Sequence, residues 1–226
     1  MPKITMLNRP IMTTGEAARQ LRIPAPTLRH WLEGGVRGGR RYQPILRPSA
    51  TGDTTMTWGE IVEARYLRAY RSRVPMQRLR PFIDELRQTF QVPHPLAHFR
   101  PFIDANRRLV LNLQERTDLP DALWLVFEGR HGQAVLNPLV QAEFLDRVEF
   151  ATGDDDEAVA IVPMGSDSPV RIDPRIKSGA ATVSGVRTEA IVERLNARQT
   201  LADIATEFSL TERAVRAAVS YEFDVA

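Results

Sequence analysis

The sequence predicts an α+β fold that is mainly helical, and three observations support this prediction. Apolar residues recur at helical spacing near both ends of the chain, in short segments separated by tight turns. Short β-prone runs lie between them, bounded by glycine and proline. The charge also changes along the chain. We therefore expect a winged helix-turn-helix domain over residues 10–90, an acidic middle domain with a small antiparallel sheet over residues 91–168, and a three-helix helix-turn-helix domain over residues 169–226.

The composition is that of an ordinary soluble globular protein, with 43% apolar and 26% charged residues. No run of about 18 apolar residues could span a membrane, and the N-terminal MPKITMLNRP lacks the apolar core of a signal peptide. We therefore expect a cytoplasmic protein with no membrane partner. Cysteine is absent, which excludes disulfides, thiolate metal sites and cysteine nucleophiles.

The charge is distributed unevenly. Residues 1–90 contain 16 Lys and Arg against 7 Asp and Glu, residues 91–170 contain 6 against 13, and residues 171–226 contain 8 of each. A basic first segment beside an acidic middle favours contact between the first segment and a polyanion.

The segment TTGEAARQLRIPAPTLRHW, residues 13–31, has the features of a helix-turn-helix. Thr13 and Glu16 form a capping box at the start of the first helix, and Ile23 is the apolar residue of the turn. Pro24 and Pro26 suit the first turn of a second helix, where a missing N–H costs little. We expect the first helix to bury Ala17, Ala18 and Leu21.

The second helix is predicted to bury Leu28, Trp31 and Leu32 and to present its opposite face to DNA. In a DNA-binding helix-turn-helix, the outward face of the second helix contacts base edges and phosphates. The outward residues, which we expect to contact base edges or phosphates, are Thr27, Arg29 and His30. Arg29 is the strongest candidate for a bidentate contact to guanine. The alternative is a plain pair of packed helices.

A glycine- and arginine-rich stretch follows and predicts a β-ribbon, or wing. Residues 40–46 and 53–57 are expected to pair, with residues 48–52 at the tip. The arginines expected over phosphates or a minor groove are Arg37, Arg40, Arg41 and Arg47. A solvated glycine-rich loop is the alternative.

Two helices are predicted over residues 58–90, packed behind the helix-turn-helix, and Pro81 should kink the second one. In the middle segment we expect an exposed acidic turn over residues 152–157, a helix or strand over residues 140–148, and a turn at residues 129–132. The expected strands are residues 108–112, 123–127, 133–136 and 158–162.

The last segment predicts a second helix-turn-helix. Thr188 begins a helix with Ile191, Val192 and Leu195 on one face. Thr200 and Asp203 form a capping box for the next helix, which should bury Leu201, Ile204 and Ala205. Thr211 caps a final helix, whose inner residues are expected to be Ala214, Val215, Ala218 and Val219.

These segments carry a resemblance to known families. Residues 10–90 look like the head of MerR-type DNA-binding domains, although Pro24 stands where a capping Ser is usual. The last 55 or so residues resemble a small antitoxin-like domain of unknown function. The matching residues are Ile172, Asp173, Pro174, Gly179, Thr182, Val183, Gly185 and Arg187. Ala181 and Val186 depart from its pattern.

The whole arrangement is similar to VapB-type antitoxins whose partner is a PIN-like ribonuclease toxin. The resemblance implies a protein that silences this toxin and represses its own operon by binding operator DNA. Because two-fold symmetric DNA usually requires a dimer, we expect a homodimer. The candidate toxin contacts are Arg171, Arg175 and Arg187.

We expect no enzyme activity, no cofactor and no metal. His94 and His98 are four residues apart, but Pro93 and Pro95 argue against a helix that would bring them together as ligands. No pattern offers a serine nucleophile with a base. Two alternatives stay open: a one-component regulator whose middle domain binds an effector, and an adaptor whose helical modules only dimerise.

Overall fold

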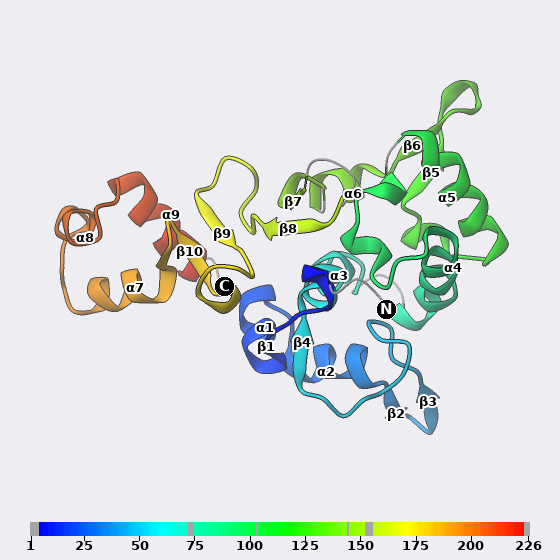
Figure 1. Ribbon diagram of the computed structural model, residues 1–226, viewed down its shortest axis with the longest axis horizontal. Coiled ribbons are helices and arrows are strands. Elements are labelled where there is room, and N and C mark those ends of the chain that lie inside the picture. Colours follow the sequence, from blue (N-terminus) through cyan, green and yellow to red (C-terminus); the bar gives the residue numbers. More distant parts are fainter. Residues whose placement is uncertain (1–4, 72–74, 103, 144, 152–155, 224–226) are drawn as a thin grey trace. The chain divides into compact units, whose positions relative to one another are not determined.

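The computed structural model describes residues 5–71, 75–102, 104–143, 145–151 and 156–223 (Figure 1). The chain forms two compact units. We call Met1–Leu145 with Phe150–Ala158 the head unit, and Asp146–Glu149 with Val159–Ala226 the tail unit. The division into residues 10–90, 91–168 and 169–226 stays a prediction.

The α+β class is confirmed, with helices and small antiparallel sheets. Among the described residues, three two-stranded sheets pair β1 (Pro10–Thr13) with β4 (Thr55–Thr57), β2 (Gly35–Arg37) with β3 (Arg40–Tyr42), and β5 (Val126–Glu128) with β6 (Ala134–Leu136). A five-stranded sheet has the order β11 (Val186–Arg187), β10 (Ala181–Val183), β9 (Val170–Ile172), β8 (Ala158–Ile161) and β7 (Val148–Phe150).

The N-terminal helix-turn-helix is confirmed. Helix α1 spans Thr14–Leu21 and α2 spans Ala25–Glu33. The capping box is present: the Glu16 carboxylate accepts from the backbone N–H of Thr13 at 2.8 Å, and the Thr13 hydroxyl accepts from the N–H of Glu16. Arg22 ends α1 in the left-handed region, and Ile23 is buried in the turn. Leu28, Trp31 and Leu32 are buried as expected.

The strands around this motif pair differently from the prediction. Strand β1, Pro10–Thr13, pairs with β4, Thr55–Thr57, and β2, Gly35–Arg37, pairs with β3, Arg40–Tyr42. The expected pairing of residues 40–46 with 53–57 is therefore wrong. Gly38 and Gly39 have φ of 57° and 73°, as a two-residue hairpin turn requires. The backbone N–H groups of Ile45 and Leu46 instead donate to the carbonyl of Trp31.

Two helices follow, as predicted. Helix α3 spans Trp58–Arg68, packs against α1 and is almost wholly buried, and α4 spans Arg80–Phe90. Pro81 does not lie inside a helix, as the prediction assumed, but in the first turn of α4, where proline is tolerated. A 3-10 helix over Met76–Leu79 precedes it. The Trp58 indole N–H donates to the carbonyl of Ala158 at 2.7 Å.

The predicted strand over residues 108–112 is wrong, because these residues lie within α5, Asp104–Arg116. Val110, Leu111, Leu113 and Gln114 are buried while Leu109 is 40% exposed, which is a helical pattern. Strands β5, Val126–Glu128, and β6, Ala134–Leu136, form a hairpin around the predicted turn. The Gln114 amide bonds to backbone groups of Leu125 and Val126.

The rest of the middle segment does not form a separate sheet. It contains α6, Pro138–Glu143, a 3-10 helix Leu145–Arg147, β7, Val148–Phe150, and β8, Ala158–Ile161. Strands β7 and β8 belong to the five-stranded sheet. A separate sheet was predicted for the middle segment because the sequence pattern indicates short strands but does not indicate which strands pair. Residues 152–155 of the expected acidic turn lie outside the described residues.

The tail unit continues with β9, Val170–Ile172, β10, Ala181–Val183, and β11, Val186–Arg187. Helices α7, Thr188–Asn196, α8, Leu201–Glu207, and α9, Glu212–Phe223, pack on one another. The Thr200–Asp203 capping box is present, and the Thr211 hydroxyl accepts from the N–H of Ala214. Ile191, Ile204, Ala205, Ala214, Val215 and Ala218 are buried, whereas Val192, Leu195, Leu201 and Val219 are partly exposed.

Among the residues that the structure describes, no helix combines the length and apolar character needed to cross a bilayer.

Candidate nucleic-acid interface

Helix α2 presents a polar face on the side opposite its packing residues. Arg29 is exposed, and Thr27 and His30 are half-buried. Arg29 makes no ion pair or side-chain hydrogen bond within the described part of the chain. Because Leu28 and Trp31 anchor the helix, the orientation of this face is fixed by core packing.

His30 is held in one orientation by two contacts. Its Nδ1 lies 3.1 Å from the carbonyl oxygen of Gly34, and its ring meets the Tyr42 ring edge-on at 5.5 Å. A carbonyl only accepts, so Nδ1 donates and Nε2 of the neutral ring is an acceptor. Such an acceptor matches the amino groups of adenine or cytosine in the major groove. Gly34 must be glycine, because φ is 66° and a Cβ would lie 2.2 Å from the Tyr42 carbonyl.

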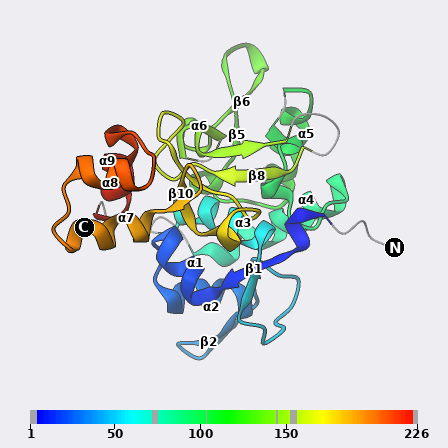
Figure 2. The same ribbon diagram turned by 60° about the vertical axis from the view of Figure 1, so that its left-hand side comes forward.

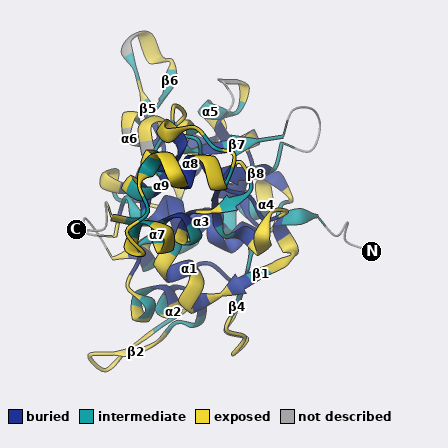
Figure 3. Cartoon of the chain, turned by 90° about the vertical axis from the view of Figure 1, so that its left-hand side faces the viewer, coloured by how far each residue is buried: buried dark blue, intermediate teal, exposed yellow. Residues whose placement is uncertain are grey.

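The β2-β3 hairpin extends beyond α2 (Figure 2) and is coloured as exposed in Figure 3. Its register sets Arg37 opposite Arg40 and Val36 opposite Arg41. Opposed residues share a face and successive residues alternate. One face therefore carries Arg37 and Arg40, and the other carries Arg41 and Val36, whose side chain is 73% exposed. None of the three arginines has an intramolecular partner among the described residues.

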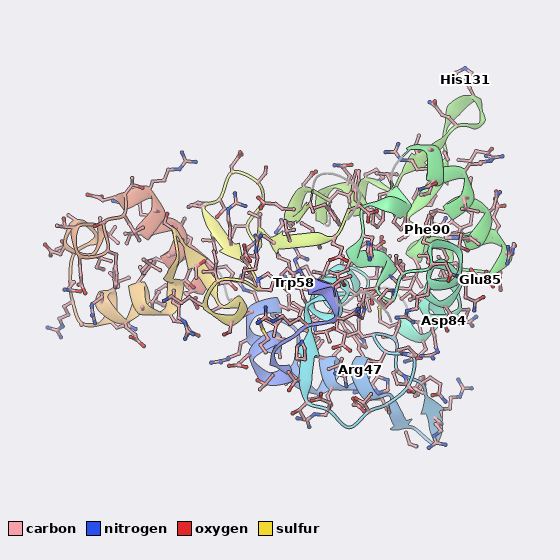
Figure 4. All side chains as sticks on the ribbon, viewed as in Figure 1. Arg47, Trp58, Asp84, Glu85, Phe90 and His131 are labelled. Carbon is pink, nitrogen blue, oxygen red and sulfur yellow. The ribbon has the colours of Figure 1, made fainter. Side chains whose placement is uncertain are left out.

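Arg47 does not belong to this surface, which corrects the prediction that it lies over DNA. It is buried, and its partners come from α2, from α3 and from residues 51–55; Figure 4 labels it. Its guanidinium donates to Glu60 at 2.6 Å, to Glu33 at 2.5 Å and to the carbonyl of Thr55 at 2.8 Å. Burial opposes its charge, but the hydrogen bond to Glu60 and the two carboxylates outweigh burial and raise the pKa of Arg47.

Two residues that the sequence did not single out lie beside the same surface. Arg71 and Gln77 line a pocket of about 470 Å³ together with Thr27, His30 and Arg37. Arg71 was only one of many arginines in the basic segment, and nothing in the local pattern marked Gln77.

Two of the histidines lie beside carboxylates. His94 Nδ1 lies 3.5 Å from the buried Glu63 carboxylate, and His98 Nδ1 lies 2.9 Å from Asp156. Residues 95–97 form a 3-10 turn, so the two rings are not on one helix face. In the described part of the chain, no three His, Cys, Asp or Glu side chains gather as a metal centre requires.

The three arginines that we expected to contact the toxin lie in the tail unit, and they differ in their side-chain partners. Arg171 forms an exposed ion pair with Glu149. Arg175 binds Asp173 through two side-chain bonds of 2.9 and 2.6 Å. Arg187 is exposed and makes no side-chain bond within the described residues.

The Asp173–Arg175 pair gives a prediction about acid stability. Burial opposes ionisation of Asp173, but hydrogen bonds and charge from Arg175 outweigh it and lower the pKa of Asp173. A carboxyl group whose pKa is lowered in the folded protein stabilises the fold at pH values above its ordinary pKa. This stabilisation is lost as the pH falls through the lowered pKa. We expect Asp173→Asn to be less stable than the wild type at about pH 7, and this difference should be smaller at about pH 3, below the ordinary pKa of an aspartate, as measured by urea unfolding. An unchanged difference at both pH values would contradict this assignment.

Comparison with known proteins agrees with these features. Residues 10–83 match a family model described as "Putative DNA-binding HTH domain", and residues 170–221 match "Protein of unknown function (DUF433)". The Mycobacterium tuberculosis protein named "Putative antitoxin VapB45" is 32% identical over 93% of this chain and 92% of its own length. The chain belongs to the VapB45 family.

Two further matches extend the comparison. The uncharacterized protein Rv2308 of Mycobacterium tuberculosis is 32% identical over 98% of this chain and 93% of its own length. The crystal structure of Rv2018 from Mycobacterium tuberculosis superposes with a TM-score of 0.75 at 32% identity, covering 95% of this chain and 100% of that one. The helix-turn-helix head therefore occurs in a full-length relative whose name is that of an antitoxin.

Proposed function

We propose that this protein is the non-enzymatic, cytoplasmic antitoxin of a type II toxin-antitoxin pair. Its MerR-like winged head binds operator DNA and represses its own operon as a homodimer, and its tail neutralises a PIN-like ribonuclease. The name of VapB45 and the family match over residues 10–83 support this proposal.

The DNA-binding part of this proposal rests on a difference between two groups of arginines in the head unit. Arg47, Arg80 and Arg87 all bond to carboxylates or carbonyls of the same unit. The arginines of α2 and the hairpin are exposed and have no such partner within the described residues. Unpaired cations on a recognition helix and a neighbouring ribbon suit DNA, because base edges and phosphates supply the missing acceptors.

In this proposal the residues have different roles. Arg29 contacts guanine, and His30 accepts from an amino group through Nε2. Thr27 contacts a base edge or a phosphate, and Arg37, Arg40 and Arg41 contact phosphates. A homodimer would place two such heads about one helical turn of DNA apart, or a multiple of it.

The tail unit is better suited to a protein partner than to DNA. Several of its arginines are already paired, including Arg194 with Glu207 and Arg216 with Glu212. Of the three candidate toxin contacts, Arg187 is the one that needs no existing pair to be broken. The resemblance implies an acidic, metal-holding toxin site, which an unpaired arginine would complement.

A two-part experiment tests this function. The protein is co-expressed with the product of the adjacent reading frame, and it should co-purify with that product and inhibit its ribonuclease activity. Arg187→Ala should weaken inhibition more than Arg198→Ala, an exposed arginine of the same unit. If the neighbouring product is not a ribonuclease, or is not bound, the antitoxin proposal fails.

The second part measures binding to a duplex from the protein's own promoter. Arg29→Ala should weaken this binding by about 1–3 kcal/mol and relax the preference at one base position. Arg78→Ala, which removes an exposed arginine outside α2 and the hairpin, should leave the preference unchanged. Equal binding of all duplexes by the wild type and Arg29→Ala would contradict the base-contact role.

A further inference from the structure

The pocket beside α2 is formed by three segments that are distant in sequence. Its lining comes from α2, from the β2-β3 hairpin, and from Arg71, Pro75, Met76 and Gln77. Its volume of about 470 Å³ lies in the range of small-molecule sites. It shares Thr27 and His30 with the outward face of α2, so it borders the candidate DNA surface.

The pocket contains polar groups whose hydrogen-bonding capacity is unused. Arg37 and Arg71 are exposed and make no ion pair or side-chain bond within the described residues. The side-chain amide nitrogen of Gln77 is shielded from solvent and has no hydrogen-bond partner. Donors that are shielded from solvent rarely lack a hydrogen-bond partner in native proteins. A bound group that accepts hydrogen bonds and carries negative charge would satisfy Gln77 and both arginines.

The remaining walls are apolar. Trp31 and Met76 are buried, and the Tyr42 ring packs against His30. Among the described residues that line the pocket, none is acidic. An anionic group joined to an apolar body fits such a lining, and a phosphate with its deoxyribose has both parts.

We propose that this pocket seats a backbone phosphate of the DNA next to the bases contacted by α2. Arg37 and Arg71 supply the charge, Gln77 supplies a neutral N–H donor, and the aromatic walls contact the sugar. The inference rests on the proposed DNA binding and adds two contacts, Arg71 and Gln77, from outside the helix-turn-helix and the hairpin. A small anionic effector is the other occupant that the test must distinguish.

The test measures the affinity of the full chain for its promoter duplex and for an unrelated duplex, at several salt concentrations. Arg71→Ala should lower affinity for both duplexes by about tenfold and reduce the slope of log affinity against log salt by about one. Gln77→Leu should lower affinity with no change in slope, because it removes a donor without a charge. Gln77→Glu should weaken binding further, because its carboxylate would face the phosphate.

Arg78→Ala is the matched control. Arg78 is exposed, follows Gln77 in the same 3-10 helix and does not line the pocket. If Arg71→Ala and Gln77→Leu match this control while Arg29→Ala loses affinity, the pocket inference is overturned and DNA binding stands. If the wild type binds neither duplex, the proposed function itself fails. A loss confined to the promoter duplex would indicate base contact and would also overturn the phosphate assignment.

Discussion

Replacing Arg47 with methionine is expected to lower the free energy of unfolding of the head unit by about 3–5 kcal/mol. The substitution keeps most of the side-chain volume but leaves the carboxylates of Glu60 and Glu33 without their common partner. Glu60 is 4% exposed, so its charge cannot simply be hydrated. Three further acceptors, Thr51 Oγ1 and the carbonyls of Asp53 and Thr55, also lose their donor.

Urea unfolding followed by tryptophan fluorescence would measure this loss, since Trp31 and Trp58 are buried in the same unit. Arg47→Lys should recover only part of it, because one ammonium cannot reproduce the planar set of guanidinium donors. Arg41→Met is the matched control: it removes an exposed, unpaired arginine and should change stability by less than about 0.5 kcal/mol. A small effect at residue 47 would mean that the buried network contributes little to the fold.

Arg47 also shows where prediction from the sequence reached its limit. In the sequence it is one more arginine in a basic stretch with Arg37, Arg40 and Arg41. Its role depends on Glu33 and Glu60, each more than a dozen residues away. The same limit applies to the pocket. Arg37 and Arg71 both line it, but α3 separates them in the sequence, so only the folded chain brings them to one site.

Features decided within a few residues were predictable. The Thr13–Glu16 and Thr200–Asp203 capping boxes depend on a three-residue spacing, and both form. The outward orientation of Arg29 follows from the apolar spacing of α2. The prediction of a strand over residues 108–112 was wrong because five residues are too few to distinguish a strand from a helix. These residues lie within α5, which extends over Asp104–Arg116.

The second large effect is expected on DNA binding. Replacing Arg37, Arg40 and Arg41 together with alanine should lower affinity for any duplex by about two orders of magnitude. Each phosphate contact contributes about 0.9 to the slope of log affinity against log salt, so the slope should fall by about 2.7 if all three arginines contact phosphates. Stability should hardly change, because none of these side chains has a partner among the described residues. Fluorescence anisotropy across a salt series measures both quantities.

A control must separate these contacts from net charge. Alanine at Arg108, Arg116 and Arg198 also removes three positive charges, from exposed positions on α5 and in the turn after α7. An effect of net charge alone would weaken DNA binding by both triple variants equally. Direct contact by the hairpin predicts a much larger loss for the hairpin variant. Equal losses would reject the hairpin as a DNA contact.

The register of the hairpin then distinguishes two ways of lying on DNA. Arg37 and Arg40 share one face, and Arg41 shares the other with Val36. A hairpin laid flat on the backbone would use one face, so only the double variant of Arg37 and Arg40, or only Arg41→Ala, would reduce the slope. A hairpin inserted edge-on into a minor groove would use both faces, so both variants would reduce the slope. Val36→Ser would then lower affinity with no change in slope, because the exposed valine contributes apolar contact without charge.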